Sequence, residues 1–181
     1  MTKVFLSGTF DDLHKERASL LSVFQRVGIA TISQEFFGAS PNCVIETITQ
    51  AISDGECYLY VLVLGFRYGC LVPQSELPQK LNYPPNTVIS FTEMEFDLAG
   101  SLRIPRLVYI KRASRRAPDH DVDDSQAQRR NLFVDKIKNS GCTHFQFRNR
   151  EDLAVQAAID IMKQLANLDV WQVTQGRDYE Q

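Results

Sequence analysis

The residue best placed for chemistry is Glu95, which lies in the sequence Ser-Phe-Thr-Glu-Met-Glu-Phe-Asp-Leu-Ala at positions 90–99. On the 3.6-residue period of a helix, the apolar side chains of this segment form one stripe, made of Phe91, Met94, Leu98, Ala99 and Leu102. Glu95 falls inside that stripe. A buried carboxylate without a partner is costly, so we expect Glu95 either to pair with a cation or to line a ligand cleft.

Glu95 suits a reaction whose transition state carries positive charge on a sugar. Cleavage of an N-glycosidic bond passes through such an oxocarbenium-like state, by analogy with glycoside hydrolysis. The dipole at a helix N-terminus also favours the ionised carboxylate. We therefore predict Glu95 as the catalytic residue. The alternative is a structural carboxylate that pairs with a buried arginine, such as Arg67 or Arg103.

Glu93, two positions earlier, has a different predicted role. The spacing Ser90-x-x-Glu93 is that of a capping box, which would employ Glu93 at the start of the helix. Glu93 is also turned about 200° round the helix from Glu95. We expect it on the solvent side, together with Asp97.

Alternating apolar runs and amphipathic runs predict the elements that position these residues. The expected strands are 3–7, 29–33, 57–64, 106–110 and 143–147, and the expected helices are about 11–28, 44–52, 90–102, 126–138 and 151–168. Strands that alternate with helices indicate an α/β protein with a parallel sheet. We predict a three-layer, flavodoxin-like fold with five parallel strands in the order 2-1-3-4-5.

Ligands of such sheets bind at the carboxyl ends of the strands, at the switch point between strands 1 and 3. The predicted substrate-binding residues there are Ser7, Gly8, Thr9, Phe10, Phe36, Arg67 and Tyr68. The small residues after the first strand would hold a phosphate or ribose through their backbone N–H groups. The arginine would pair with a phosphate and the tyrosine would contact a ribose, while the phenylalanine loop would cover a base.

Each of these assignments has a structural alternative. The Ser-Gly-Thr sequence is also typical of an ordinary tight turn, and the residue pair at positions 67–68 could be an exposed arginine and a tyrosine at the sheet edge. Phe36 and Phe37 could form a hydrophobic plug. Arg17 is either half of a surface pair with Glu16 or a tie between its helix and the ligand loop.

Composition excludes several function classes. The net charge of −2 argues against a nucleic-acid binder, and the basic run 111–116 is followed closely by aspartates that compensate it. The four cysteines and three histidines show no metal-ligand spacing, so we expect no metal and no cofactor besides a nucleotide substrate. Without a signal peptide or a membrane-length apolar run, we expect a cytoplasmic protein with no membrane contact.

Four sequence motifs resemble an uncharacterised TIR-like domain family found at the N-termini of NACHT and related STAND ATPases, including prokaryotic immune proteins. They are Val-Phe-Leu-Ser-Gly-Thr-Phe-Asp-Asp-Leu from position 4 with Glu16-Arg17, Glu-Phe-Phe-Gly-Ala at 35–39, Tyr-Val-Leu-Val-Leu-Gly-Phe-Arg-Tyr-Gly at 60–69, and Ser-Phe-Thr-Glu-Met-Glu-Phe at 90–96. The resemblance covers about residues 3–112. Gly8 departs from it, since the family usually has a second serine there, and the segment 71–89 is longer than usual.

The wider resemblance is to TIR domains and nucleoside deoxyribosyltransferases, which place a glutamate on the helix after the third strand in a Glu-x-x-x-Ala context. Glu95-Phe-Asp-Leu-Ala99 is similar to that pattern. The resemblance implies an NAD+ nucleosidase (glycohydrolase) or related nucleotide hydrolase that acts in antiviral defence when self-associated. The polar residues after Trp171 predict a domain over residues 1–170 and a tail or linker over 171–181. The resemblance implies a STAND ATPase as a fusion or binding partner.

Two other functions stay open from the sequence. The chain could be a non-catalytic signalling or oligomerisation module of a STAND ATPase, because many TIR-like domains only assemble. It could also be a deoxyribosyltransferase-like enzyme or a nucleotide N-glycosidase.

Overall fold

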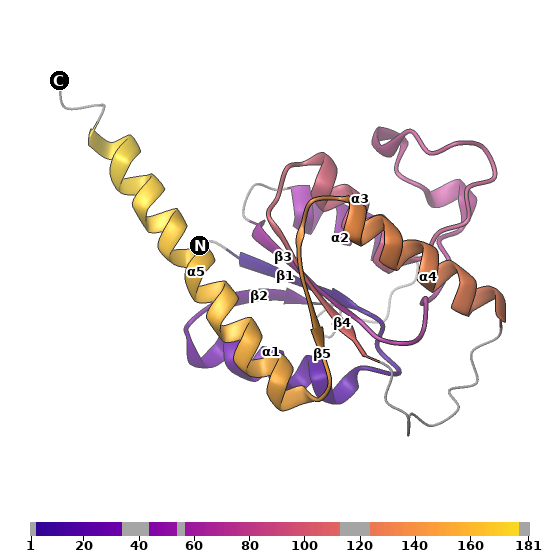
Figure 1. The fold of residues 1–181 in the computed structure, drawn as a ribbon. Coiled ribbons are helices and arrows are strands. Elements are labelled where there is room, and N and C mark those ends of the chain that lie inside the picture. The colour runs from indigo at the N-terminus through magenta and orange to yellow at the C-terminus, as the bar shows by residue number, and fades with distance from the viewer. Residues whose placement is uncertain (1–2, 34–43, 54–56, 113–123, 178–181) are drawn as a thin grey trace.

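The computed structural model describes residues 3–33, 44–53, 57–112 and 124–177 of the 181-residue chain. A single sheet of five strands forms its centre, with the order β2-β1-β3-β4-β5 (Figure 1). All four strand pairs are parallel. The strands are β1 (Lys3–Gly8), β2 (Ala30–Ser33), β3 (Cys57–Leu64), β4 (Arg106–Lys111) and β5 (Thr143–Phe147). The predicted α/β class and the predicted strand order are therefore confirmed.

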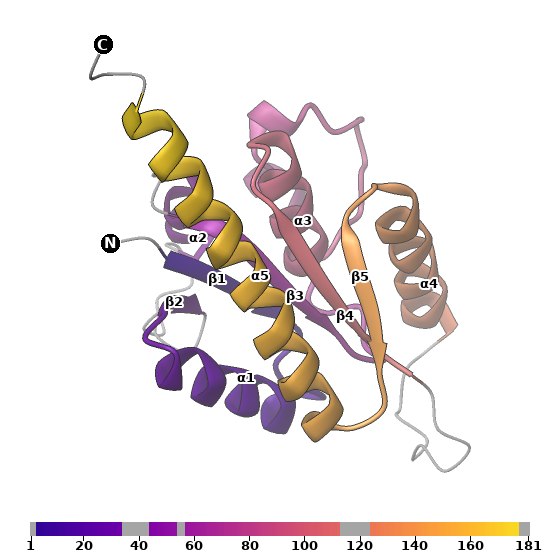
Figure 2. The same cartoon turned by 60° about the vertical axis from the view of Figure 1, so that its left-hand side comes forward.

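Helices cover both faces of the sheet, which makes the three layers of a flavodoxin-like fold (Figure 2). The helices are α1 (His14–Arg26), α2 (Val44–Ser53), α3 (Phe91–Ser101), α4 (Asp124–Asn139) and α5 (Arg150–Arg177). α1 and α5 share one hydrophobic cluster with the sheet, whereas α2, α3 and α4 contribute to the cluster on the other face.

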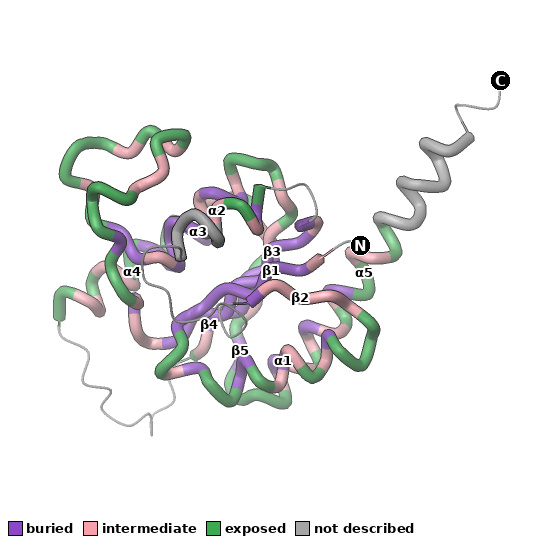
Figure 3. Tube along the Cα trace, turned by 180° about the vertical axis from the view of Figure 1, so that it is seen from behind, coloured by how far each residue is buried: buried purple, intermediate pink, exposed green. Residues whose placement is uncertain are grey.

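Strand β3 shows why both faces must be covered. Leu59, Val61 and Val63 point into the cluster under α1 and α5, while the alternate residues Tyr60, Leu62 and Leu64 point into the opposite cluster. A strand buried on both faces reads as a continuous apolar run, which is the pattern of Cys-Tyr-Leu-Tyr-Val-Leu-Val-Leu. Figure 3 shows this strand and its neighbour β1 as the buried centre of the domain.

The segment between β3 and α3 is long and contains two short 3₁₀ helices, η3 (Gln74–Glu76) and η4 (Gln79–Leu81). Its two ends are held together because the Val72 amide donates to Ile89 O at 2.9 Å and the Phe91 amide donates to Cys70 O at 3.0 Å. Between them the segment is mainly exposed (Figure 3). We call residues 71–89 the strap.

Two helix boundaries differ from those expected. α1 begins at His14 and not near Asp11, because Asp11 and Asp12 direct their side chains to the loop after β3. α5 continues to Arg177, beyond the expected end at Leu168, and so includes much of the segment that we expected as a tail (Figure 1). Whether that segment links the domain to another stays a prediction.

Candidate active site

The carboxylate of Glu95 meets the carboxyl end of β1. Ser7, next to last in that strand, donates its hydroxyl hydrogen to Glu95 Oε2 in a short, buried hydrogen bond. The contact forms because β1 and β3 are neighbours in the sheet and α3 packs against this face of both strands. The sheet therefore brings together a predicted binding residue and the predicted catalytic residue.

Glu95 is almost fully enclosed, with only 1% of its surface exposed. Burial raises the pKa of its carboxyl group to about 7, although the Ser7 hydrogen bond and the Arg17 charge both act to lower it. The burial of Tyr60 itself, together with the charge of Glu95, raises the pKa of Tyr60 well above its usual value. Glu95 therefore changes charge close to neutral pH, which is the range useful for catalysis.

Arg17 is the cation that stabilises the Glu95 charge, and it is itself 1% exposed. Its guanidinium donates from Nη1 to Gly8 O at 3.1 Å and from Nη2 to Ser33 Oγ at 3.0 Å. The side chain thus joins the carboxyl ends of β1 and β2 to α1. This confirms that Arg17 ties its helix to the end of β1, and its burial rules out the surface pair with Glu16. Ligand binding at that end of β1 stays a prediction.

Gly8 allows the backbone to approach β3 closely. It has a φ of +146°, and a Cβ on this residue would overlap the carbonyl oxygen of Val63. A side chain at this position would also come within 3.3 Å of Arg17 Nη1. The residue that departs from the usual family pattern is therefore required by the packing of this chain.

The carboxylate of Asp12 joins the loops after β1 and β3, and we call its contacts the Asp12 clasp. Asp12 Oδ2 accepts from the backbone amides of Phe66 at 2.8 Å and Arg67 at 3.1 Å, and Asp12 Oδ1 accepts from the Thr9 hydroxyl in a short bond. Two backbone N–H groups and one hydroxyl thus donate to a single carboxylate, and these three bonds fix the two loops against each other. Asp12 is a positioning residue that the sequence analysis did not single out, although its place just after the Ser-Gly-Thr turn was a usable signal.

The remaining predicted binding residues that the structure describes have different surroundings and contact different partners. Arg67 lies at the surface and pairs with Asp11 at 3.2 Å, as the structural alternative proposed. Phe10 is 45% exposed and packs beside His14. Tyr68 is buried and donates to Glu93, not to Glu95. Phe36 lies outside the described residues.

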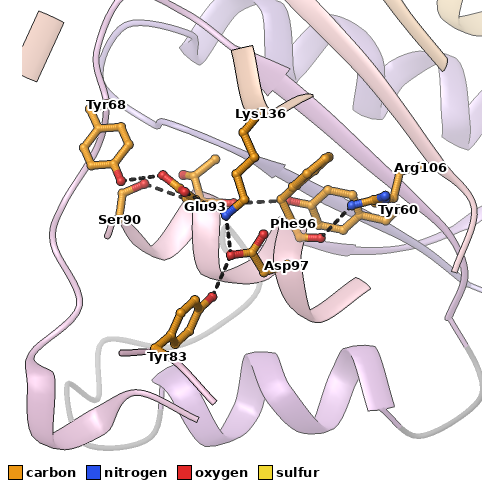
Figure 4. A network of polar contacts seen from close by, with 10 residues as sticks. Tyr60, Tyr68, Tyr83, Ser90, Glu93, Phe96, Asp97, Arg106 and Lys136 are labelled. Atoms are coloured by element: carbon orange, nitrogen blue, oxygen red, sulfur yellow. Dashed lines mark hydrogen bonds and ion pairs between the residues drawn. The ribbon is translucent and has the colours of Figure 1, made fainter. Parts of the chain in front are cut away.

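Glu93 belongs to a polar network on the face of α3 that meets α4 (Figure 4). Its carboxylate accepts from the Tyr68 hydroxyl at 2.5 Å and from Lys136 Nζ at 2.8 Å. Lys136 also donates to Asp97 at 2.6 Å, and Asp97 accepts from the Tyr83 hydroxyl of the strap at 2.8 Å. This network joins α3, α4 and the strap.

The prediction that Glu93 faces solvent is therefore wrong. Helix α4 and Tyr68 cover it, because the sheet continues to β4 and β5 and its helix α4 packs beside α3. The capping interaction itself is present, since the Glu93 amide donates to Ser90 Oγ at 3.2 Å.

Glu95 does not line any of three pockets formed by described residues, which lie between α1 and α5, beside β5, and at the ends of β3 and β4. Within the described ranges no cluster of three or more histidine, cysteine or carboxylate side chains could hold a metal ion. In the same ranges, no helix has the length and apolar character needed to cross a bilayer.

Comparison with known proteins decides the family. The model of a family described as "Domain of unknown function (DUF4062)" matches residues 3–162, which is most of the chain. The chain belongs to the DUF4062 family. None of the curated proteins matches its sequence significantly.

A solved structure shows that the fold of this chain is TIR-like. The chain is similar to a TIR domain in the crystal structure of the RPS4 and RRS1 TIR domain heterodimer, with a TM-score of 0.52 and 11% identity. The match covers 91% of this chain and 98% of the other. The shared feature is the fold, in agreement with the resemblance noted from the motifs.

Proposed function

We propose that this DUF4062 domain hydrolyses the N-glycosidic bond of NAD+ or a related nucleotide, and that it does so when self-associated in immune signalling. The observation that carries the proposal is the Ser7–Glu95 pair, a buried carboxylate at the carboxyl ends of β1 and β3 with a pKa of about 7. The ends of these two strands form the switch point of the sheet, where ligands of this fold class bind.

The proposed step breaks the bond between the ribose anomeric carbon and the base nitrogen. The base leaves with the bonding electron pair, and the positive charge that develops on the ribose is stabilised by the Glu95 carboxylate. Water then adds to the anomeric carbon and releases a proton. Ser7 orients the carboxylate, and Arg17 keeps a larger fraction of it ionised at neutral pH.

Access to Glu95 requires movement, because the side chain is 1% exposed. We propose that self-association provides it, by shifting the loops after β1 and β3 that the Asp12 clasp holds. A TIR domain that shares this fold crystallised as a heterodimer, which supports assembly as a property to test. Fusion or partnership with a NACHT or STAND ATPase is part of the same proposal.

The experiment is a mass-spectrometric turnover assay with NAD+ and a set of nucleotides over a range of protein concentrations. We expect base release that increases more steeply than linearly with concentration and is lost in Glu95→Gln. Glu76→Gln on the exposed strap is the control for the same chemical change and should retain full activity. Equal turnover by Glu95→Gln and the unmodified protein would overturn the assignment.

The enclosure of Glu95 also favours a second candidate, a signalling module that assembles without catalysis. In that case the Ser7–Glu95 contact only fixes α3 to β1. Concentration-dependent assembly without turnover of any nucleotide would support this function. Exchange of one base for another, without net hydrolysis, would instead support a deoxyribosyltransferase-like enzyme. Hydrolysis of mononucleotides but not of NAD+ would support a nucleotide N-glycosidase.

A further inference from the structure

The pocket at the carboxyl ends of β3 and β4 is separate from Glu95 and has its own chemical character. It has a volume of about 460 Å³ and extends from Phe66, just after β3, across the end of β4 to the second half of α4. Four basic side chains line it, Lys111, Arg112, Arg130 and Lys138, against one acidic side chain, Asp135. The carboxyl edge of a parallel sheet is the usual ligand-binding edge of this fold class.

Among the described residues, the acids that act on these cations do not neutralise their charge completely. Lys111 pairs with Glu16 at 2.6 Å, and the negative charge of Asp12 acts on Arg130. Lys138 meets Asp135 at 3.4 Å, with both side chains about half exposed or more, so that ion pair is weak. One positive charge remains in excess when these three carboxylates are counted.

Arg130 is the residue that makes the pocket suited to an anion. Its Nε donates to Gly65 O at 2.9 Å, which fixes the guanidinium at the end of β3, and its Nη1 meets Asn131 Oδ1 at 3.4 Å. A guanidinium has five N–H donors, so these two bonds leave donors for a ligand. Burial opposes the charge of Arg130 and lowers its pKa, so an anion beside it would recover part of that cost.

We propose that this pocket binds a phosphorylated small molecule, with the phosphate held by Arg130, Arg112 and Lys138. A planar guanidinium matches the oxygens of a phosphate in a two-point hydrogen bond, and flanking cations add charge. Phe66 and Val134 provide apolar walls for the organic part of the ligand. The site is independent of the N-glycosidic chemistry proposed above, because Glu95 is not among its lining residues.

Inorganic pyrophosphate is the probe that tests the phosphate part alone, since it has no glycosidic bond. We expect the full chain to bind it with a Kd below about 1 mM in calorimetry, and amide signals of residues 66, 111 and 130–138 to shift in nitrogen-labelled NMR spectra. The double variant Arg112→Gln/Lys138→Gln should bind at least tenfold more weakly. Both side chains lie at the surface or partly exposed, so the fold is retained.

Arg103→Gln/Lys163→Gln is the matched control, because it removes two exposed positive charges outside the pocket. The control and Glu95→Gln should both bind pyrophosphate as the unmodified protein does. Absence of binding, equal weakening in the control, or shifts that cluster at residues 7–9 would each overturn the proposal. These outcomes do not depend on whether the domain hydrolyses any nucleotide.

Discussion

The hydroxyl of Ser7 donates to the carboxylate of Glu95, 88 residues further along the chain. This contact links the carboxyl end of β1 to the first turns of α3, and the Arg17 guanidinium bonds to Gly8, the next residue of β1, and to Ser33 of β2. The acidic group at the centre of the domain thus accepts from a hydroxyl and lies near the positive charge of Arg17. Its protonation affects both stability and the proposed chemistry.

Glu95→Gln should stabilise the protein at high pH. Because the folded-state pKa of about 7 exceeds the reference value of 4.5, the unfolded chain loses this proton first as the pH rises. The free energy of unfolding therefore falls as the pH rises from 4.5 to about 7 and then stays level. The total loss is about 3 kcal/mol. The glutamine variant lacks this loss. Denaturant unfolding should give similar stabilities near pH 4 and a clear advantage for Glu95→Gln at pH 8.

The same titration sets the pH dependence of the proposed activity. Stabilisation of a ribosyl cation requires the ionised carboxylate, so base release should increase as the pH rises through about 7. Arg17→Met removes the charge that lowers this pKa, and the midpoint should move to higher pH. Arg17→Lys should restore part of the shift. A midpoint that stays unchanged in Arg17→Met would contradict the role given to Arg17.

Gly8→Ala should cost about 3 kcal/mol or more, because the new Cβ would overlap Val63 O and the residue would keep a positive φ. Gly28→Ala is the matched control. Gly28 also has a positive φ, of +73°, but nothing lies within 4 Å of its added Cβ, so only the backbone penalty of about 1–2 kcal/mol applies. Chemical unfolding measures both, and equal losses would show that the close approach of β1 to β3 is not limiting.

Lys136→Met and Tyr83→Phe should not have additive effects. Both donors use Asp97 Oδ2, so removal of one changes the environment of the other. Because Lys136 is 39% exposed, we expect solvent to limit its single loss to about 1 kcal/mol, and the tyrosine change should cost about 1 kcal/mol. A double-mutant cycle should give a coupling of at least about 0.5 kcal/mol. Strict additivity would mean that strap and α4 are held independently.

Local sequence patterns predicted most of the fold correctly. The run at Cys57–Leu64 shows the continuous apolar character of a doubly buried strand, and its bounds match β3. The helix from Phe91 was predicted together with its capping serine. The C-terminal limit of α5 was not, because a polar helix end has no apolar period to mark its continuation.

The candidate site divides differently between sequence and structure. Helical periodicity alone placed Glu95 among core residues, because it depends only on short-range spacing. The predicted strand order alone placed Ser7 at the same sheet edge, because parallel topology brings the carboxyl ends of the strands together. The catalytic role of Glu95 stays a prediction. Which charges surround each acid was decided only by the tertiary structure. Arg17 acts on Glu95, and Lys136 covers Glu93 from 43 residues away, since ion pairs between elements depend on how helices pack and leave no periodic trace in the chain.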